Sequence, residues 1–256
     1  MRTLSLAERL LQELGVTEPN EIDLEAIAWH VGVRVRYENL DSCEARILGY
    51  GNRAIVTIDP RRSRRRLRFS LAHELGHWRL HRGQSFICRP DDIGNANRGV
   101  ADPERMADGY AADLILPEYL FRPRARRAKQ ANLDLAKELS EIFDVSLTAT
   151  ALRLVEFGPE PLMLVCHTPR RRKWFKASKD VPSRWFPMEH IDPESPSFDV
   201  LYGKIEQSRR SLIGADAWFD CAGADRFEIH EQSIRINSDE MLSFITFKDE
   251  RMLGGA

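Results

Sequence analysis

The feature that most constrains this chain is the segment FSLAHELGHWRLH, residues 69–81, in which three histidines and a glutamate recur at helical spacing. At about 100° per residue, one stripe about 100° wide contains Ser70, His73, Glu74, His77 and His81, and apolar residues occupy most of the remaining surface. The segment is therefore predicted to be a buried helix with one polar stripe. Buried polar groups cost about 1–3 kcal/mol each when they lack partners, so this stripe requires partners.

The pattern HExxH within this segment predicts a metal site. His73 and His77 stand at i and i+4, so their imidazoles aim at one point, and Glu74 lies beside that point. Two zinc ligands and a general base are typical of this arrangement. Ser70 is expected to cap the start of the helix, and Gly83 is expected to end it.

A catalytic zinc ion needs a third protein ligand and an open position. His81 lies about 12 Å along the helix from His73, which is too far for both to join His77 on one ion. The next predicted helix carries Glu104 and Asp108 at i and i+4. We predict that Glu104 is the third ligand and that Asp108 accepts the N–H of a ligand histidine. Taken alone, such a pair of acidic residues is also common on solvated helix faces.

Periodicity along the rest of the chain predicts an α+β protein in three parts. Residues 1–130 alternate helical patterns with short β-rich segments, residues 131–158 form two helices, and residues 159–256 are β-rich. A strand at 54–58 precedes the HExxH helix, and at a sheet edge it would hold an extended substrate. A glycine- and asparagine-containing loop is expected at 91–99.

Composition narrows the class of protein. The chain has 256 residues, and its 38 Lys and Arg nearly balance its 39 Asp and Glu, which argues against a protein built mainly to coat nucleic acid or anionic membranes. Its four cysteines are far apart and form no CxxC pair, so neither a zinc ribbon nor a disulfide framework is indicated. No apolar run approaches about 18 residues and no signal peptide is recognisable, so we expect a soluble, cytoplasmic protein.

The segment LSEIFDVSLTATALRL has the spacing of a helix-turn-helix, with Val145 in the turn and Ser146 capping the second helix. The residues of this segment fit a DNA-reading helix-turn-helix less well than its spacing does. The start of that second helix, residues 147–151, lacks the Arg, Lys, Asn or Gln that read base edges, and Asp144 stands where such turns usually have Gly. A structural or substrate-docking role is the preferred interpretation.

Three basic clusters lie at residues 61–68, 122–127 and 169–173. Such runs usually form solvated faces. Because the first cluster adjoins the HExxH helix, its alternative role is to steer an acidic substrate segment or nucleic acid.

The segment RFSLAHELGHWRLH, followed by ERMADGYAADLILP, resembles the ImmA/IrrE family of bacterial metallopeptidases. The usual pattern of that family is RF(S/T)LAHELGH and later ExxA(N/D)xFAxxLLxP, and the match runs through residues 68–117. The resemblance implies that His73, His77 and Glu104 hold one Zn²⁺ per chain and that Glu74 is the catalytic base. Tyr110 replaces the usual Phe, a change that we interpret as core packing.

The resemblance also implies a domain organisation close to the IrrE-type branch. Residues 1–130 are expected to form a gluzincin-like zinc metallopeptidase domain of helices on a short sheet, followed by a helix-turn-helix-like segment at 131–158. Residues 159–256 are expected to form a β-rich accessory or sensor domain. This domain is either GAF-like or a different module that binds a partner or a small ligand.

Members of the family typically cleave helix-turn-helix repressors and thereby release stress-response or mobile-element genes. The resemblance therefore implies a zinc-dependent, site-specific endopeptidase whose partner is such a repressor. The sequence itself indicates no membrane partner, and it leaves binding of nucleic acid open but without sequence specificity. The alternative is a DNA-binding or partner-binding regulator that uses residues 131–158 and whose zinc is structural. The sequence indicates no oligomeric state.

Overall fold

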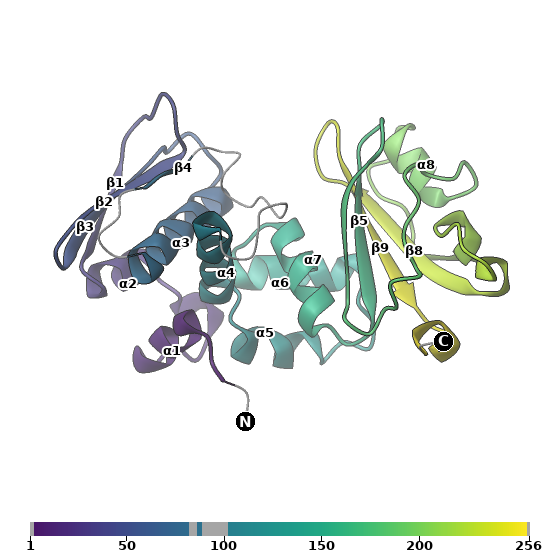
Figure 1. The fold of residues 1–256 in the computed structure, drawn as a ribbon, viewed down its shortest axis with the longest axis horizontal. Coiled ribbons are helices and arrows are strands. Elements are labelled where there is room, and N and C mark those ends of the chain that lie inside the picture. The colour runs from purple at the N-terminus through teal and green to yellow at the C-terminus, as the bar shows by residue number, and fades with distance from the viewer. Residues whose placement is uncertain (1–2, 82–85, 89–101, 255–256) are drawn as a thin grey trace. The chain divides into compact units, whose positions relative to one another are not determined.

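The computed structural model describes residues 3–81, 86–88 and 102–254, and its ribbon is shown in Figure 1. The chain divides into two compact units. Unit 1 comprises Met1–Phe121 and Ser140–Ser146, and unit 2 comprises Arg122–Leu139 and Leu147–Ala256. Helices and sheets occur in both, which confirms the predicted α+β class. The three-part division that the sequence suggests stays a prediction.

Unit 1 combines helices with sheet A. In chain order its elements are α1 (Leu6–Glu13), the short helix η1 (Pro19–Glu21), α2 (Leu24–His30), β1 (Val33–Tyr37), β2 (Ala45–Tyr50), β3 (Arg53–Ile58), α3 (Arg64–Leu80), β4 (Phe86–Cys88) and α4 (Pro103–Ile115). Local chemistry starts the first helix, because the backbone N–H of Glu8 donates to Ser5 Oγ while the Glu8 carboxylate accepts from the Ser5 N–H.

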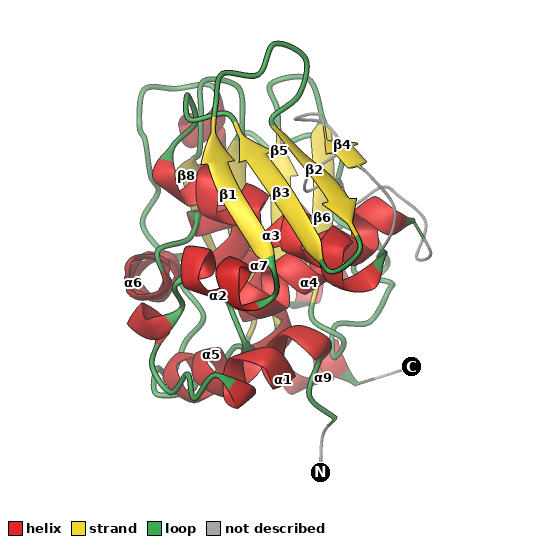
Figure 2. Ribbon diagram, turned by 90° about the vertical axis from the view of Figure 1, so that its left-hand side faces the viewer, coloured by secondary structure: helices red, strands yellow, loops and turns green. Residues whose placement is uncertain are grey.

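In the described residues sheet A has four strands, in the order β1-β3-β2-β4. β1 runs parallel to β3, and β2 is antiparallel to both β3 and β4. Figure 2 shows this sheet with α3 behind it. Because β3 is paired on both sides, residues 54–58 are not a sheet edge, and the substrate-holding role that depended on an edge does not apply. A short hydrophobic strand by itself does not show which neighbours it will have.

Helix α3 begins earlier than the sequence suggests. Its N-cap is Ser63, whose side chain accepts from the N–H of Arg66. Ser70 lies in the middle of the helix with no exposed surface, so the predicted cap was wrong. The arginine-rich start lacks apolar periodicity and was therefore assigned to a surface cluster instead of a helix. The helix ends at Leu80 with His81 as its C-cap.

Two sequence expectations cannot be compared with the fold. Gly83 and the loop at 91–99 lie outside the described residues.

A glycine lets α3 and α4 approach closely. A Cβ atom added at Gly76 would lie 2.9 Å from both the Cα and the carbonyl oxygen of Ala107. These are backbone atoms, so they cannot swing aside. Gly76 and its neighbour His77 are buried against α4, which carries Glu104 and Asp108. The contact therefore sets how far the carboxylates of α4 lie from the histidines of α3.

The middle of the chain is helical. α5 (Glu118–Ala125) and α6 (Leu133–Phe143) each begin in one unit and end in the other, and α7 (Leu147–Phe157) belongs to unit 2. The predicted break between the last two helices at residues 144–146 is confirmed. Asp144 adopts a left-handed backbone with φ of 51°, the conformation for which Gly was expected.

Unit 2 contains the predicted β-rich region. Its strands are β5 (Leu162–His167), β6 (Arg172–Ala177), β7 (Ser211–Gly214), β8 (Glu228–Arg235) and β9 (Met241–Phe247), and its short helices are α8 (Pro196–Leu201), η2 (Ala215–Ala217), η3 (Ala224–Arg226) and α9 (Glu250–Leu253). The strands form sheet B in the order β6-β5-β9-β8-β7, with antiparallel pairing throughout. Aromatic and aliphatic side chains, among them Trp185, Trp218 and Phe219, form its core.

None of the helices in the described parts of the chain combines the length and the apolarity that a membrane span requires.

Candidate metal centre

Helix α3 presents its polar stripe to the interior of unit 1. The side chains of His73, Glu74 and His77 are buried there with 1% exposure or less. The strands of sheet A pack on α3, and α4 covers it from another side. The indole of Trp78 donates to the carbonyl of Val31 at 2.9 Å, which fixes the rotation of the helix about its axis. The polar stripe is therefore held at one fixed position in the unit.

Three of the predicted ligands converge. His73 Nε2 lies 3.0 Å from His77 Nε2 and 3.1 Å from Glu104 Oε2, and His77 Nε2 lies 3.4 Å from the same oxygen. Glu104 sits in the first turn of α4, which begins at Pro103 and is capped by Asp102. The cap accepts the N–H of Glu104 at 2.9 Å, so the start of the helix places this carboxylate over the histidines.

Asp108 lies one turn further along α4. Its Oδ1 is 2.9 Å from Nδ1 of His73, the ring nitrogen that points away from the cluster. When Nδ1 carries the proton and donates it to Asp108, the lone pair of Nε2 faces the other donors. The carboxylate therefore orients the imidazole for binding a cation.

Charges at this cluster favour a cation. Burial lowers the pKa of His73, but its hydrogen bonds to Asp108 and Glu104 outweigh burial and raise the pKa to about 9. Burial pushes the pKa of Glu104 upward, and contacts with His73 and His77 outweigh it, holding that pKa below its usual range. Burial lowers the pKa of His77. Without a metal, the charge of a proton on His73 offsets only part of the charge of the Glu104 and Asp108 carboxylates, and a divalent ion can replace that proton.

Glu74 points into the same buried region without a comparable partner. Neither of its carboxylate oxygens has a hydrogen-bond partner in the described part of the chain. Burial raises its pKa to about 7, and the nearby charge of His73 and the Cys88 thiol lower it by less. A carboxyl group with a pKa near neutrality can both accept and release a proton at physiological pH.

Cys88 is a site residue that the sequence interpretation missed. It is fully buried in β4, and its Sγ lies 3.6 Å from His77 Nε2. The donor atoms of His73, His77, Cys88 and Glu104 all lie within 4.8 Å of one another. The sequence interpretation did not consider the cysteines as ligands, because they form no CxxC pair. Pairing of β4 with β2 brings Cys88 to the site, and the local spacing of residues does not reveal such pairing.

The donor set fits zinc. Two ligands about 2.0–2.1 Å from a tetrahedral ion lie roughly 3.3 Å apart, and the nitrogen and oxygen atoms of His73, His77 and Glu104 lie 3.0–3.4 Å apart. Imidazole, thiolate and carboxylate are all ligands that zinc accepts. His81 does not belong to this converging group among the described residues.

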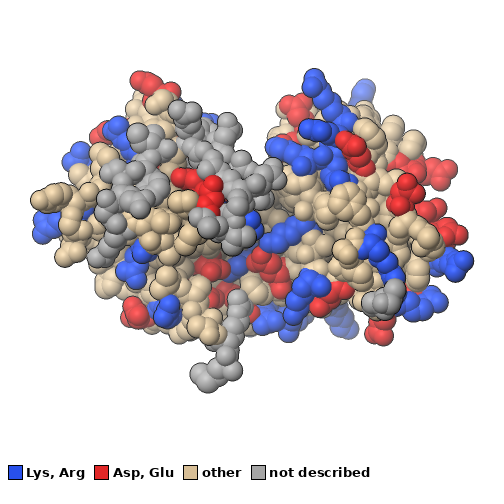
Figure 3. All heavy atoms as spheres, in the orientation of Figure 1, with Lys and Arg blue, Asp and Glu red and all other residues tan. Residues whose placement is uncertain are grey.

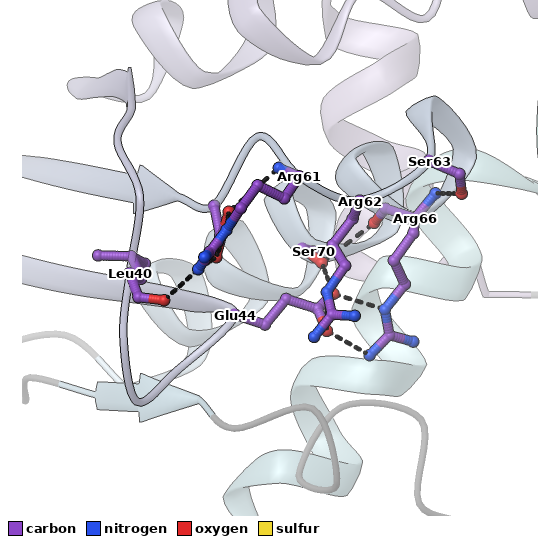
Figure 4. A network of polar contacts seen from close by, with 8 residues as sticks. Leu40, Glu44, Arg61, Arg62, Ser63, Arg66 and Ser70 are labelled. Carbon is purple, nitrogen blue, oxygen red and sulfur yellow. Dashed lines mark hydrogen bonds and ion pairs between the residues drawn. The ribbon is translucent and has the colours of Figure 1, made fainter.

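Ser70 belongs to a polar network beside the cluster, drawn in Figure 4. Its hydroxyl donates to the buried carboxylate of Glu44 at 2.6 Å, and Arg66 donates to both oxygens of the same carboxylate. Arg61 pairs with Asp59 and donates to a backbone carbonyl. The network ties α3 to the chain segment before β2.

The first basic cluster is thus engaged within unit 1. Besides Arg61 and Arg66, which belong to the network of Figure 4, Arg64 pairs with Asp144 at 2.9 Å and Arg65 with Glu141 at 2.6 Å. Figure 3 shows basic and acidic groups interspersed on the face in view. These pairs favour the structural interpretation of the cluster over a steering role.

The histidines of the C-terminal region contribute no metal cluster in the described residues. His167 is buried in β5, with its ring 5.7 Å from that of Trp218. His230 lies in β8. Tyr110, predicted to be a core residue, is 5% exposed, which confirms its packing role.

Comparisons with known proteins agree with this geometry. The family model described as "IrrE N-terminal-like domain" matches residues 28–155, which is half of the chain and includes the whole cluster. A Mycobacterium tuberculosis transcriptional regulator of known structure superposes with a TM-score of 0.59 over 96% of this chain and 87% of its own. The two sequences are 13% identical, so the similarity shows the fold alone. No curated protein is a significant match.

Proposed function

The chain belongs to the IrrE N-terminal-like family of peptidases, and from this premise we propose that it is a zinc-dependent, site-specific endopeptidase. The zinc ligands in this proposal are His73, His77 and Glu104, and Glu74 is the general base. The observation that carries the proposal is the convergence of three donor atoms beside a buried carboxylate that lacks a hydrogen-bond partner in the described residues.

Each of these side chains has a distinct task. A bound zinc ion supplies a Lewis acid that polarises the scissile carbonyl and lowers the pKa of a water molecule toward about 7. Glu74 takes the proton from the attacking water and passes it to the departing amine, for which its raised pKa suits it. Asp108 holds the ring of His73 in position through the 2.9 Å contact with Nδ1.

The proposed substrate is a helix-turn-helix repressor. The support is the resemblance to the ImmA/IrrE pattern and the shared fold with a protein described as a transcriptional regulator. Burial of the site residues suits cleavage at a defined position better than digestion of unfolded proteins. Release of stress-response or mobile-element genes is the expected consequence.

A second candidate function is a regulator that binds DNA or a protein partner through α6 and α7. The turn between them has the left-handed residue that a helix-turn-helix requires, at Asp144. Asp144 also pairs with Arg64, and Arg68 lies 3.5 Å from its carboxylate, so this residue holds the turn inside unit 1. These contacts favour a structural role for the turn over contact with bases.

The test uses Glu74→Gln in the full chain. The amide keeps the size of the side chain but cannot accept the proton, so zinc content and fold should persist while cleavage falls by about 100-fold or more. The substrates are purified repressors encoded beside the gene of this protein, with cleavage followed by mass spectrometry. A His73→Ala, His77→Ala double variant is the metal-free control. Cleavage by Glu74→Gln at the wild-type rate would refute the assignment of the base.

A further inference from the structure

Cys88 is fixed at the metal centre by backbone pairing. β4 is antiparallel to β2, with Cys88 opposite Ala45, and the N–H of Glu44 donates to the carbonyl of Cys88 at 3.0 Å. The Glu44 side chain is held by Arg66 and Ser70 of α3. Helix α3 therefore positions the thiol as well as the two histidines.

The distance from the sulfur to His77 matches that between two zinc ligands. A nitrogen and a sulfur bound to one tetrahedral zinc ion lie about 3.6 Å apart, since Zn–N is about 2.0–2.1 Å and Zn–S about 2.3 Å. Cys88 Sγ lies 3.6 Å from His77 Nε2. The donor atoms of both histidines, the carboxylate and this sulfur lie within 4.8 Å of one another, so a small approach of the sulfur would complete a set of four donors.

Four protein ligands have a functional consequence. Structural zinc sites are closed by four protein side chains, whereas catalytic sites keep one position for water. Thiolates are soft ligands that zinc binds firmly. A thiolate at the fourth position would exclude the water that Glu74 must deprotonate.

We propose that Cys88 is a fourth, displaceable zinc ligand that keeps the peptidase inactive until the thiolate withdraws. This inference rests on the proposed function and adds its regulation. With zinc held by His73, His77, Glu104 and Cys88, activation would be a ligand exchange in which Sγ releases the ion and takes up a proton from solvent, which leaves that position open to water. No electron is transferred.

The place of Cys88 in the fold suits a ligand that leaves. In the described residues β4 is a three-residue strand at the end of sheet A, and its pairing is with β2 alone. His73 and His77 lie instead on a helix of 17 residues. Withdrawal of Cys88 breaks a few strand contacts and leaves the other three donors in place.

The first experiment is cobalt substitution of the metal-free full chain, with absorption spectra of wild type, Cys88→Ala, Cys88→Ser and Cys166→Ala. Cys166 is the matched control because it is equally buried in a strand but belongs to unit 2. We expect one cobalt ion per chain in all four proteins. A sulfur-to-cobalt charge-transfer band should appear in wild type and Cys166→Ala and be absent from both Cys88 variants.

The second experiment measures whether the fourth position is open, with acetohydroxamate as the probe ligand. Its apparent affinity for the cobalt-loaded protein should rise by at least about ten-fold when Cys88 is replaced, because the closed form of wild type competes with the probe. Equal affinity of wild type and the Cys88 variants would overturn the closing role.

These outcomes distinguish a failure of the proposed role of Cys88 from a failure of the proposed function. If wild type binds one cobalt ion but shows no sulfur-to-cobalt band, only the role of Cys88 is overturned. Cys88 would then be a neutral thiol beside Glu74. A double variant His73→Ala, His77→Ala that binds cobalt like wild type would instead contradict the proposed function. The wild-type spectrum is decisive even if both Cys88 variants fail to fold.

Discussion

At the scale of single residues, burial acts with opposite sign on two groups of this chain. It raises the pKa of Glu74 to about 7, because the charged form of an acid is penalised, and lowers the pKa of His167 to about 4, because the charged form of a base is penalised. Glu74 lies at the candidate centre. His167 lies in the core of unit 2 and donates to the carbonyl of Met188 at 3.4 Å.

His167 should make unit 2 sensitive to acid. Its folded pKa of about 4 lies below the ordinary value of 6.5, so unfolding takes up a proton between these values. The stabilising contribution is present above pH 6.5 and is lost as the pH falls toward 4, with roughly 2–3 kcal/mol lost by pH 4.5. Urea unfolding at pH 7.5 and pH 4.5 measures this loss.

His167→Gln provides the comparison, because glutamine does not titrate. The pH dependence of its free energy of unfolding should be smaller than that of wild type by the same amount. Parallel pH dependence in the two proteins would show that His167 is not buried in its neutral form.

Residue-scale prediction from the sequence succeeds where the pattern is local. His73 and His77 are one helical turn apart, so their convergence follows from helix geometry, and the same holds for Glu104 and Asp108. The contact between the two helices was anticipated because a catalytic zinc ion needs a third protein ligand, and the next predicted helix offers Glu104. Cys88 could not be found in this way, because strand pairing between β4 and β2 places it.

At the scale of elements, the approach of α3 to α4 controls the centre. Gly76→Ala would place a Cβ atom 2.9 Å from the backbone of Ala107, so α4 must shift and carry Glu104 with it. We expect destabilisation of roughly 1–3 kcal/mol. Zinc affinity, measured by competition with a chromogenic chelator, should fall by about ten-fold or more, since a shift of Glu104 loosens one ligand.

Gly109→Ala is the matched control. Gly109 lies on α4, and an added Cβ atom there meets nothing within 4 Å. This variant should keep the zinc affinity of wild type and gain up to about 1 kcal/mol in stability, since Ala favours helix over Gly. An equal change in zinc affinity in the two variants would contradict the claim that the contact between Gly76 and Ala107 positions Glu104.

Most elements were predictable from period and composition, but their ends and neighbours were not. The start of α3 was placed at Ser70 because arginines hide the helical pattern of residues 64–68. Whether β3 is a sheet edge was left open, because its sequence does not reveal that β1 and β2 lie on either side. Short strands such as β7, with four residues, give little periodicity from which to place them.

At the scale of the whole molecule, the candidate ligands all belong to unit 1. A metal that binds the folded form stabilises it by about 2.7 kcal/mol at a concentration of 100 times Kd. Removal of zinc by a chelator should therefore speed amide hydrogen exchange in α3 and α4 and leave β8 and β9 of unit 2 unchanged. Mass spectrometry resolves these segments.

The double variant His73→Ala, His77→Ala controls for effects of the chelator itself, and its exchange should not respond to chelation. Equal acceleration in both units of wild type would contradict a site confined to unit 1.

The organisation of the whole chain was predicted in outline. The α+β class and the change to β-rich structure after Gly158 could be predicted from the pattern of apolar and β-branched residues and from the turn residues at the boundary. The assignment of residues 140–146 to unit 1 was not foreseen, because long-range pairs such as that of Arg64 with Asp144 are invisible to local patterns. A GAF-like identity for the C-terminal region stays a prediction.

The most direct test of the central claim is anomalous diffraction at the zinc absorption edge, on crystals of the full chain grown with one equivalent of zinc. The account predicts a single strong peak about 2.0–2.2 Å from Nε2 of His73, Nε2 of His77 and a carboxylate oxygen of Glu104. A peak bound elsewhere, or the absence of any peak at these three residues, would contradict it.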